Sequence, residues 1–159
     1  RGSSGTLFED IPKTDWDALV NFHPPAMILL QFGGNSVPGV ETRAQARWIG
    51  QRMRTNLLFL RSIFPKVPIL FIGPSDMGQH ETDYPGLSWV IDELTAAALE
   101  SGALYWDLRS VMGGSGSMRE WVDKGWASED HIHFTRKGAS EVAKRLETAI
   151  HLEWESMTP

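Results

Sequence analysis

Apolar residues form continuous runs of strand length at three places along the chain. Residues 26–32 read AMILLQF, residues 67–72 read VPILFI, and a shorter run covers residues 103–106 and ends at Asp107. Such runs are typical of strands that are covered on both faces, as in a parallel sheet. We therefore expect three buried strands that run in parallel.

Between and after these runs, apolar residues recur at helical spacing. This spacing predicts a long helix over residues 41–64 and a second helix over residues 88–101. A last helix is expected to begin near Thr135, a good N-cap residue. A short helix capped by Thr14 or Asp15 is expected before the first strand, so helices and strands alternate along the whole sequence.

This order of elements predicts an α/β fold, a three-layer α/β/α sandwich built on a parallel sheet. The pattern shows no internal repeat and no linker, so a single domain over residues 1–159 is expected. Doubly wound sheets usually begin with a strand, whereas this chain begins with a loop that leads into a helix. We therefore expect the first strand of the sheet to be missing from this chain.

Composition narrows the class of protein further. The chain has 159 residues, of which 42% are hydrophobic, enough for one domain with a core. A net charge of −5 gives no indication of the basic surface that binds nucleic acid. No stretch approaches the ~20 apolar residues of a membrane span. The absence of cysteine excludes disulfides and a cysteine nucleophile.

The loop after the first strand carries a candidate for catalysis. In open parallel sheets, ligands bind beyond the carboxyl ends of the strands. Gly33 and Gly34 allow a sharp turn there, and the amide of Asn35 could then donate a hydrogen bond to an oxyanion. The alternative is a plain turn, since Gly-Asn combinations are common in turns.

A second candidate is the segment Asp130-His131-Ile132-His133, just before the last helix. A carboxylate three residues before an imidazole can accept its ring N–H and leave the other ring nitrogen as a base. The alternatives are a capping carboxylate with surface histidines, or a metal site. A metal could draw on Asp76, His80, Asp130, His131 and His133.

The tryptophans allow two interpretations. Trp106, Trp121 and Trp126 either pack in the core or form a platform on which a sugar ring stacks. Trp121 and Trp126, together with Gly34, are therefore candidate substrate contacts.

Taken together, these segments resemble the SGNH hydrolase superfamily, the GDSL-like lipases and acylhydrolases. Residues 33–35 look like its Gly-x-Asn block, which implies that Asn35 is an oxyanion donor. Asp130-x-x-His133 looks like its last block, which implies that His133 is the general base and that Asp130 orients it. Gly2, in a Gly-Ser-Ser-Gly turn, looks like the block whose backbone N–H completes the oxyanion hole.

The resemblance implies a serine-type esterase that needs no cofactor and removes acetyl or other short acyl groups. The wider sequence is similar to bacterial carbohydrate and peptidoglycan O-acetylesterases, which suggests an acylated glycan as substrate and export to the periplasm or cell surface. No Gly-Asp-Ser occurs in the chain, so the nucleophile is expected on an upstream segment, and this chain alone is expected to be inactive. The alternatives are a non-catalytic glycan-binding domain and a metal-dependent hydrolase.

Overall fold

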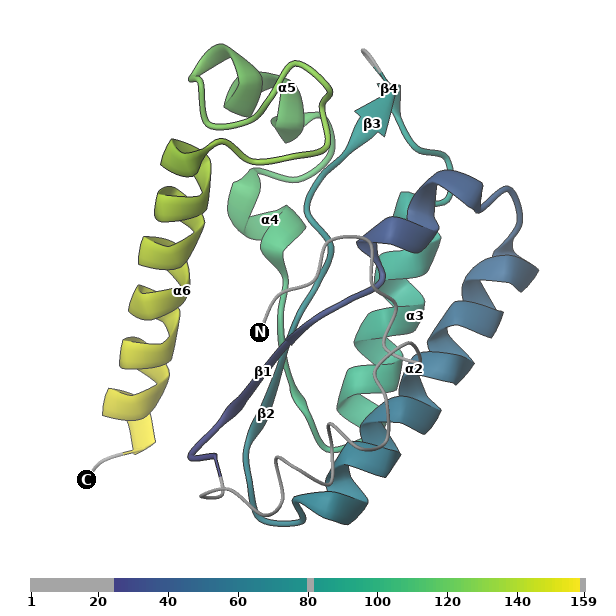
Figure 1. Ribbon diagram of the computed structural model, residues 1–159, viewed down its shortest axis with the longest axis vertical. Helices are drawn as coiled ribbons and strands as arrows, with labels where there is room; N and C mark the ends of the chain where they lie inside the picture. The colour runs from purple at the N-terminus through teal and green to yellow at the C-terminus, as the bar shows by residue number, and fades with distance from the viewer. Residues whose placement is uncertain (1–24, 80–81, 158–159) are drawn as a thin grey trace. The chain divides into compact units, whose positions relative to one another are not determined.

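The computed structural model describes residues 25–79 and 82–157 (Figure 1). Contacts divide the chain into two compact units, which are described one at a time. The first contains residues 25–74 and Tyr84–Asp107, and the second contains Ser75–Asp83 and residues 108–157. The helix expected at Thr14 or Asp15 lies outside the described residues, and the single domain stays a prediction.

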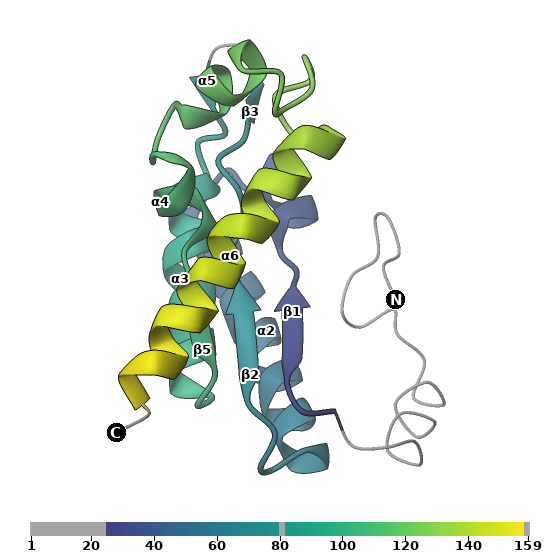
Figure 2. The same ribbon diagram turned by 90° about the vertical axis from the view of Figure 1, so that its left-hand side faces the viewer.

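The first unit contains a three-stranded sheet. Its strands are β1 (Ile28–Gln31), β2 (Ile69–Ile72) and β5 (Leu104–Trp106), in the order β1-β2-β5. Both pairings are parallel (Figure 2). In the first pairing, Ile28 lies opposite Ile69. The predicted α/β class with a parallel sheet is therefore confirmed, and all three expected strands are present.

The three strands are not equally buried. Every residue of the central strand β2 is buried, which explains its continuous apolar run. In β1, Leu30 is 6% exposed but Leu29 is 53% exposed. Because successive side chains of a strand point to opposite faces of the sheet, one face of β1 is covered at this point and the other is largely exposed.

Two helices of the first unit, α2 (Arg43–Ile63) and α3 (Leu87–Glu100), pack against each other on the same side of this sheet (Figure 1). A capping box starts α2: the Thr42 hydroxyl accepts from the Gln45 backbone N–H at 3.3 Å, and the Gln45 side chain accepts from the Thr42 N–H at 2.8 Å. Both predicted helices are therefore confirmed to within one or two residues.

The second unit contains several elements that the sequence pattern did not predict. These are a hairpin of β3 (Gly78–Gln79) and β4 (Thr82–Asp83), and the helices α4 (Leu108–Met112) and α5 (Ser117–Asp123). Elements of two to seven residues contain too few positions to show a period, which explains why they were missed.

The last helix, α6 (Arg136–Met157), begins where the sequence predicts. The Thr135 hydroxyl accepts from the Gly138 N–H at 3.2 Å, as an N-cap does, and donates to the Gly125 carbonyl at 2.8 Å. A Cβ at Gly138 would lie 1.8 Å from the Trp126 carbonyl oxygen. Only glycine therefore allows this close contact between the start of α6 and the preceding loop.

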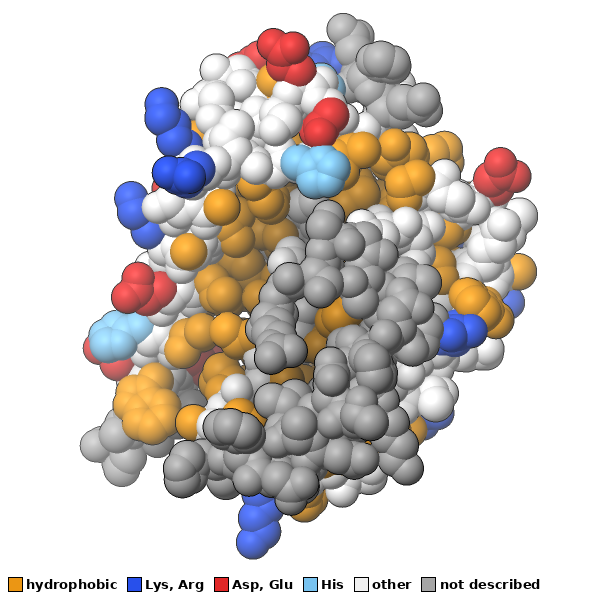
Figure 3. Space-filling view, viewed as in Figure 1, with side chains coloured by type: hydrophobic (Ala, Val, Ile, Leu, Met, Phe, Trp, Pro, Cys, Tyr) orange, Lys and Arg blue, Asp and Glu red, His pale blue; other side chains and the backbone are white. Residues whose placement is uncertain are grey.

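Hydrophobic side chains remain on the surface of α6, where Leu152 is 60% and Trp154 is 66% exposed (Figure 3). Nevertheless, no helix in the described part of the chain is long and apolar enough to cross a membrane.

Candidate functional site

The Gly-Gly-Asn segment lies at the carboxyl end of β1, where the chain enters the 3-10 helix η2 (Gly34–Gly39). Gly33 has a φ of 102°, and a Cβ there would lie 2.5 Å from a methyl carbon of Leu94. Glycine is therefore favoured at this position by its backbone conformation, since the methyl group of Leu94 could shift to make room for a Cβ. The Asn35 residue is exposed at this end of the strand.

In the second unit, Asp130 and His133 form a hydrogen-bonded pair. Asp130 Oδ2 and His133 Nδ1 are 2.7 Å apart. Because an ionised carboxylate only accepts, the Nδ1 of neutral His133 carries the proton, and Nε2 is left with a free lone pair. The His133 side chain is 74% exposed, so this nitrogen is open to a substrate or nucleophile. This is the arrangement expected of a general base and the carboxylate that orients it.

The loop that carries Asp130 and His133 is held in shape by hydrogen bonds to its own backbone groups. Asp130 Oδ1 accepts from the N–H groups of Ile132 and His133 at 2.9 and 3.0 Å. The Ser128 N–H donates to the His133 carbonyl at 2.8 Å, and His131 has a positive φ of 56°, which tightens the turn. The loop therefore presents the His133 ring in a defined direction.

These hydrogen bonds also set the ionisation of Asp130. Partial burial acts to raise the pKa of its carboxyl, but the hydrogen bonds from the His133 backbone, the His133 ring and the Ile132 backbone outweigh it. Together they lower the pKa of Asp130 from 3.8 to about 2.

We therefore expect the carboxyl carbon of Asp130 to titrate with a midpoint near pH 2 in the folded protein, measured by carbon-detected NMR. Because the folded-state pKa is lowered, the stabilisation is fully present above about pH 4 and is lost as the pH falls toward 2. The same carboxyl in the urea-unfolded protein is the control and should titrate near its ordinary value. A midpoint near 3.8 in the folded protein would contradict the hydrogen-bonded loop.

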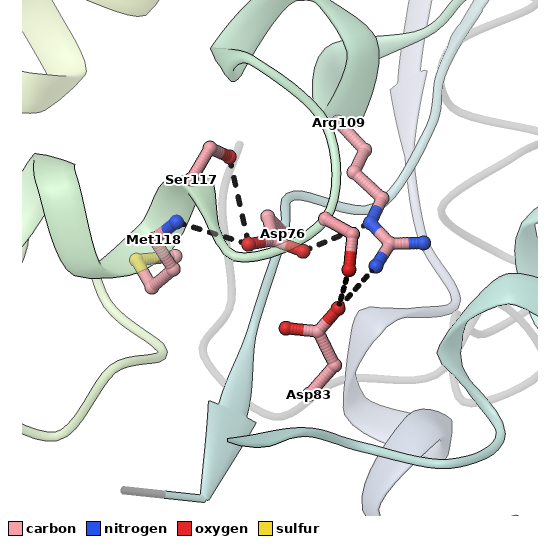
Figure 4. Close-up of polar contacts among 6 residues, drawn as sticks. Asp76, Asp83, Arg109, Ser117 and Met118 are labelled. Carbon is pink, nitrogen blue, oxygen red and sulfur yellow. Dashed lines mark hydrogen bonds and ion pairs between the residues drawn. The ribbon is translucent and has the colours of Figure 1, made fainter. Parts of the chain in front are cut away.

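A buried carboxylate, Asp76, lies at the centre of a polar network in the second unit (Figure 4). Its side chain is 0% exposed. Oδ1 accepts from Arg109 Nε at 2.8 Å, and Oδ2 accepts from the Met118 N–H at 2.9 Å and the Ser117 hydroxyl at 3.5 Å. Arg109 Nη2 also pairs with Asp83 Oδ2 at 2.5 Å. The buried charge of Asp76 is thus compensated by a cation and by several hydrogen bonds.

This network was not predicted from the sequence, where Asp76 was expected only as a possible metal ligand and Arg109 had no expected role. One signal was present: Asp76 follows β2 and Arg109 follows β5, and the carboxyl ends of adjacent parallel strands meet at one edge of a sheet. That placement favours an ion pair between the two side chains.

A metal site finds no support among residues 25–79 and 82–157, where no three His, Asp or Glu side chains are grouped to hold an ion. Asp130 and His133 bind each other, and Asp76 binds Arg109. His80 and the predicted oxyanion donor Gly2 lie outside the described residues.

The proposed sugar platform needs a correction at Trp121. Its side chain is 1% exposed, its Nε1 donates to the Met112 carbonyl at 3.1 Å, and its ring packs against those of Trp126 and Phe134. Trp121 is therefore a core residue, because no face of its ring is open to a ligand. Trp106, at 9% exposure, is also buried, whereas Trp126 is half-buried and stays a weaker candidate, as does Gly34.

Comparison with known proteins identifies the fold. No family model matches the chain, and no curated protein sequence matches it. Solved structures do match: a peptidoglycan O-acetylesterase has a TM-score of 0.77 at 23% identity. A protein from Parabacteroides merdae ATCC 43184 described as a GDSL-like lipase has a TM-score of 0.68 at 17%, and a protein from Lactobacillus plantarum has 0.66 at 16%. The chain therefore has an SGNH hydrolase-like fold.

The extent of these matches differs. The alignment covers 92% of this chain but only 45% of the O-acetylesterase, so the chain spans less than half the length of that protein. The alignment with the Parabacteroides protein covers 91% of this chain and 68% of that protein. The alignment with the Lactobacillus protein covers 100% of this chain and 92% of that protein. At these identities the likeness defines the fold and leaves the activity to be argued from the site.

Proposed function

We propose that this chain supplies the base, its orienting carboxylate and the oxyanion donors of a serine-type esterase. The observation that carries the proposal is the Asp130–His133 pair, with its 2.7 Å hydrogen bond and exposed ring. The SGNH hydrolase-like fold supports it. The substrate we propose is an acetyl or other short acyl ester of a carbohydrate, because one structural neighbour is a peptidoglycan O-acetylesterase.

The reaction proceeds through an acyl-enzyme. His133 Nε2 takes the proton from a serine hydroxyl as the serine oxygen attacks the ester carbonyl carbon. Asn35 and the Gly2 backbone N–H stabilise the oxyanion of the tetrahedral intermediate. The imidazolium, stabilised by Asp130, gives its proton to the departing alcohol. His133 then activates a water molecule that hydrolyses the acyl-enzyme.

The nucleophile of this mechanism comes from a segment upstream of Arg1. No Gly-Asp-Ser block occurs in these 159 residues, and none of the serines near the proposed site has that context. Among the described residues, β1 has a neighbouring strand on one side only, which supports this idea, since another parallel strand could pair with its other edge. A nucleophile at the carboxyl end of such a strand would lie at the same edge of the sheet as Asn35. The chain by itself then lacks activity.

A fluorophosphonate probe tests this assignment on the full-length protein. We expect it to label one serine upstream of Arg1, identified by peptide mass spectrometry, and to stop hydrolysis of p-nitrophenyl acetate. Activity should be unaffected by a chelator, because no step uses a metal. Labelling of Ser36 or Ser75, or activity that a chelator abolishes and a divalent ion restores, would rule out the proposed nucleophile.

A further inference from the structure

The loop that carries the proposed base, residues 128–133, is closed by a β-bridge between Ala127 and Phe134. The His133 side chain is 74% exposed, so packing around the ring does little to fix its position. Its direction therefore depends on the loop backbone and on what holds the two ends of the loop. Both ends contact one residue, Trp121 of α5.

The backbone of Trp121 holds the first end of the loop. Its carbonyl accepts from the Trp126 N–H at 2.7 Å and from the Ala127 N–H at 3.0 Å. Ala127 is only 4% exposed, and a hydrogen bond away from water is stronger than one at the surface. The loop therefore starts from a point that is fixed to α5.

The indole ring of Trp121 holds the other end. Phe134 directly follows His133, and its ring centroid lies 5.3 Å from that of Trp121, a favourable distance for an aromatic pair. Where a chain is extended, as at the β-bridge of Phe134, adjacent side chains point in opposite directions. The contact of Phe134 with Trp121 therefore fits the exposure of His133 on the other side of the backbone.

Trp121 is itself held from several sides. Its side chain is 1% exposed, and its Nε1 donates to the Met112 carbonyl at 3.1 Å. The guanidinium carbon of Arg145 lies 5.4 Å from the centroid of its ring, and Arg145 Nη1 donates to the Val111 carbonyl at 2.5 Å. Trp121 therefore joins the loop to both α4 and α6.

Other contacts set the internal shape of the loop. The Asp130 carboxylate binds the Ile132 and His133 N–H groups and the His133 ring, and the His131 carbonyl accepts from the Gly78 N–H at 3.2 Å. None of these hydrogen bonds uses a side chain of Trp121 or Phe134. A substitution of either aromatic residue is therefore expected to free an end of the loop and to keep the Asp130–His133 pair.

We propose that Trp121 and Phe134 are positioning residues that fix the place of the His133 imidazole relative to the attacking serine. A displacement of a catalytic group by about 1 Å can lower a rate about 100-fold, so such anchoring matters for catalysis. The effect on catalysis rests on the proposed function, whereas the anchoring of the loop does not.

Phe134→Ala tests the proposal in the full-length protein. We expect kcat for p-nitrophenyl acetate to fall about 10- to 100-fold with KM within about twofold, because the base is misplaced while the site still admits the ester. Phe134→Tyr keeps the ring, and Phe134 is only half-buried, so this variant should restore most of the activity. The ring-nitrogen NMR shifts of His133 should still report a protonated Nδ1 in both variants, because its bond to Asp130 lies within the loop.

Leu108→Ala is the matched control, since Leu108 is a 0% exposed residue of α4 in the same unit. It also leaves a cavity in the core, so its urea midpoint should fall at least as far as that of Phe134→Ala. Its kcat should nevertheless stay within about twofold of the wild type. Equal losses of kcat in Leu108→Ala and Phe134→Ala, or a loss in Phe134→Ala that is confined to KM, would overturn the positioning role.

Nitrogen relaxation measures the order of the loop apart from catalysis. The order parameter of the His133 N–H should fall from about 0.85 in the wild type to below about 0.6 in Phe134→Ala. Such a fall in a full-length protein that hydrolyses no ester would support the anchoring and overturn the proposed function alone. An order parameter that is the same in both proteins would overturn the anchoring itself.

Discussion

Replacing His133 by alanine is expected to lower kcat for p-nitrophenyl acetate by roughly 10⁴-fold or more in the full-length protein. The substitution removes the only imidazole that is hydrogen-bonded to Asp130 among the described residues. Without it, no group takes the proton from the attacking serine or returns it to the departing alcohol. The side chain is 74% exposed, so the loss should appear in kcat with little change in stability.

His151→Ala is the matched control for this substitution. His151 is also an exposed histidine paired with a carboxylate, Glu155, at 3.2 Å, but it lies on α6 and has no part in the proposed mechanism. Its activity should remain within about twofold of the wild type. If His133→Ala turned over the ester as fast as His151→Ala, the assignment of His133 as the base would be wrong.

The largest effect on stability is expected at Asp76. Asp76→Ala should lower the free energy of unfolding by about 3–5 kcal/mol, as measured by urea denaturation, because it breaks a buried ion pair. Arg109, whose side chain is only 12% exposed, loses one of its two carboxylate partners. The Met118 N–H also loses its acceptor in a buried position.

Glu120→Ala provides the comparison, because it removes a carboxylate from an exposed ion pair. Glu120 and Lys124 lie 3.4 Å apart with side chains 70% and 50% exposed, so the expected loss is about 0.5 kcal/mol or less. Similar losses for Asp76→Ala and Glu120→Ala would mean that the network around Asp76 adds nothing beyond a surface ion pair.

The elements that could be predicted from the sequence are those with a continuous apolar run, a long periodic pattern, or contacts between residues close together in the chain. The run at residues 67–72 identifies β2, because a fully buried strand leaves no polar position. The helices α2 and α6 are long enough to show their period, and Thr42 and Thr135 cap them as expected of threonine. Asp130 and His133 are three residues apart, so their hydrogen bond was among the alternatives that the spacing allowed.

The interactions that could not be predicted join residues far apart in the sequence. Asp76 and Arg109 are 33 positions apart, and their pairing depends on how the chain folds between them. The burial of Trp121 follows from its packing against Phe134 and from a hydrogen bond to the Met112 carbonyl. None of these contacts produces a periodic pattern in the sequence. Both a core role and a surface role were therefore possible for Trp121.

The two carboxylate oxygens of Asp130 make different hydrogen bonds, and this limits which residues can replace Asp130 in a library of variants. Oδ2 holds the His133 ring, while Oδ1 holds two backbone N–H groups of the same loop. Glutamate has both oxygens but one more methylene, and alanine has neither oxygen. Selection for turnover should therefore return aspartate alone, and the activity lost by any other residue will combine an effect on proton transfer with an effect on loop geometry.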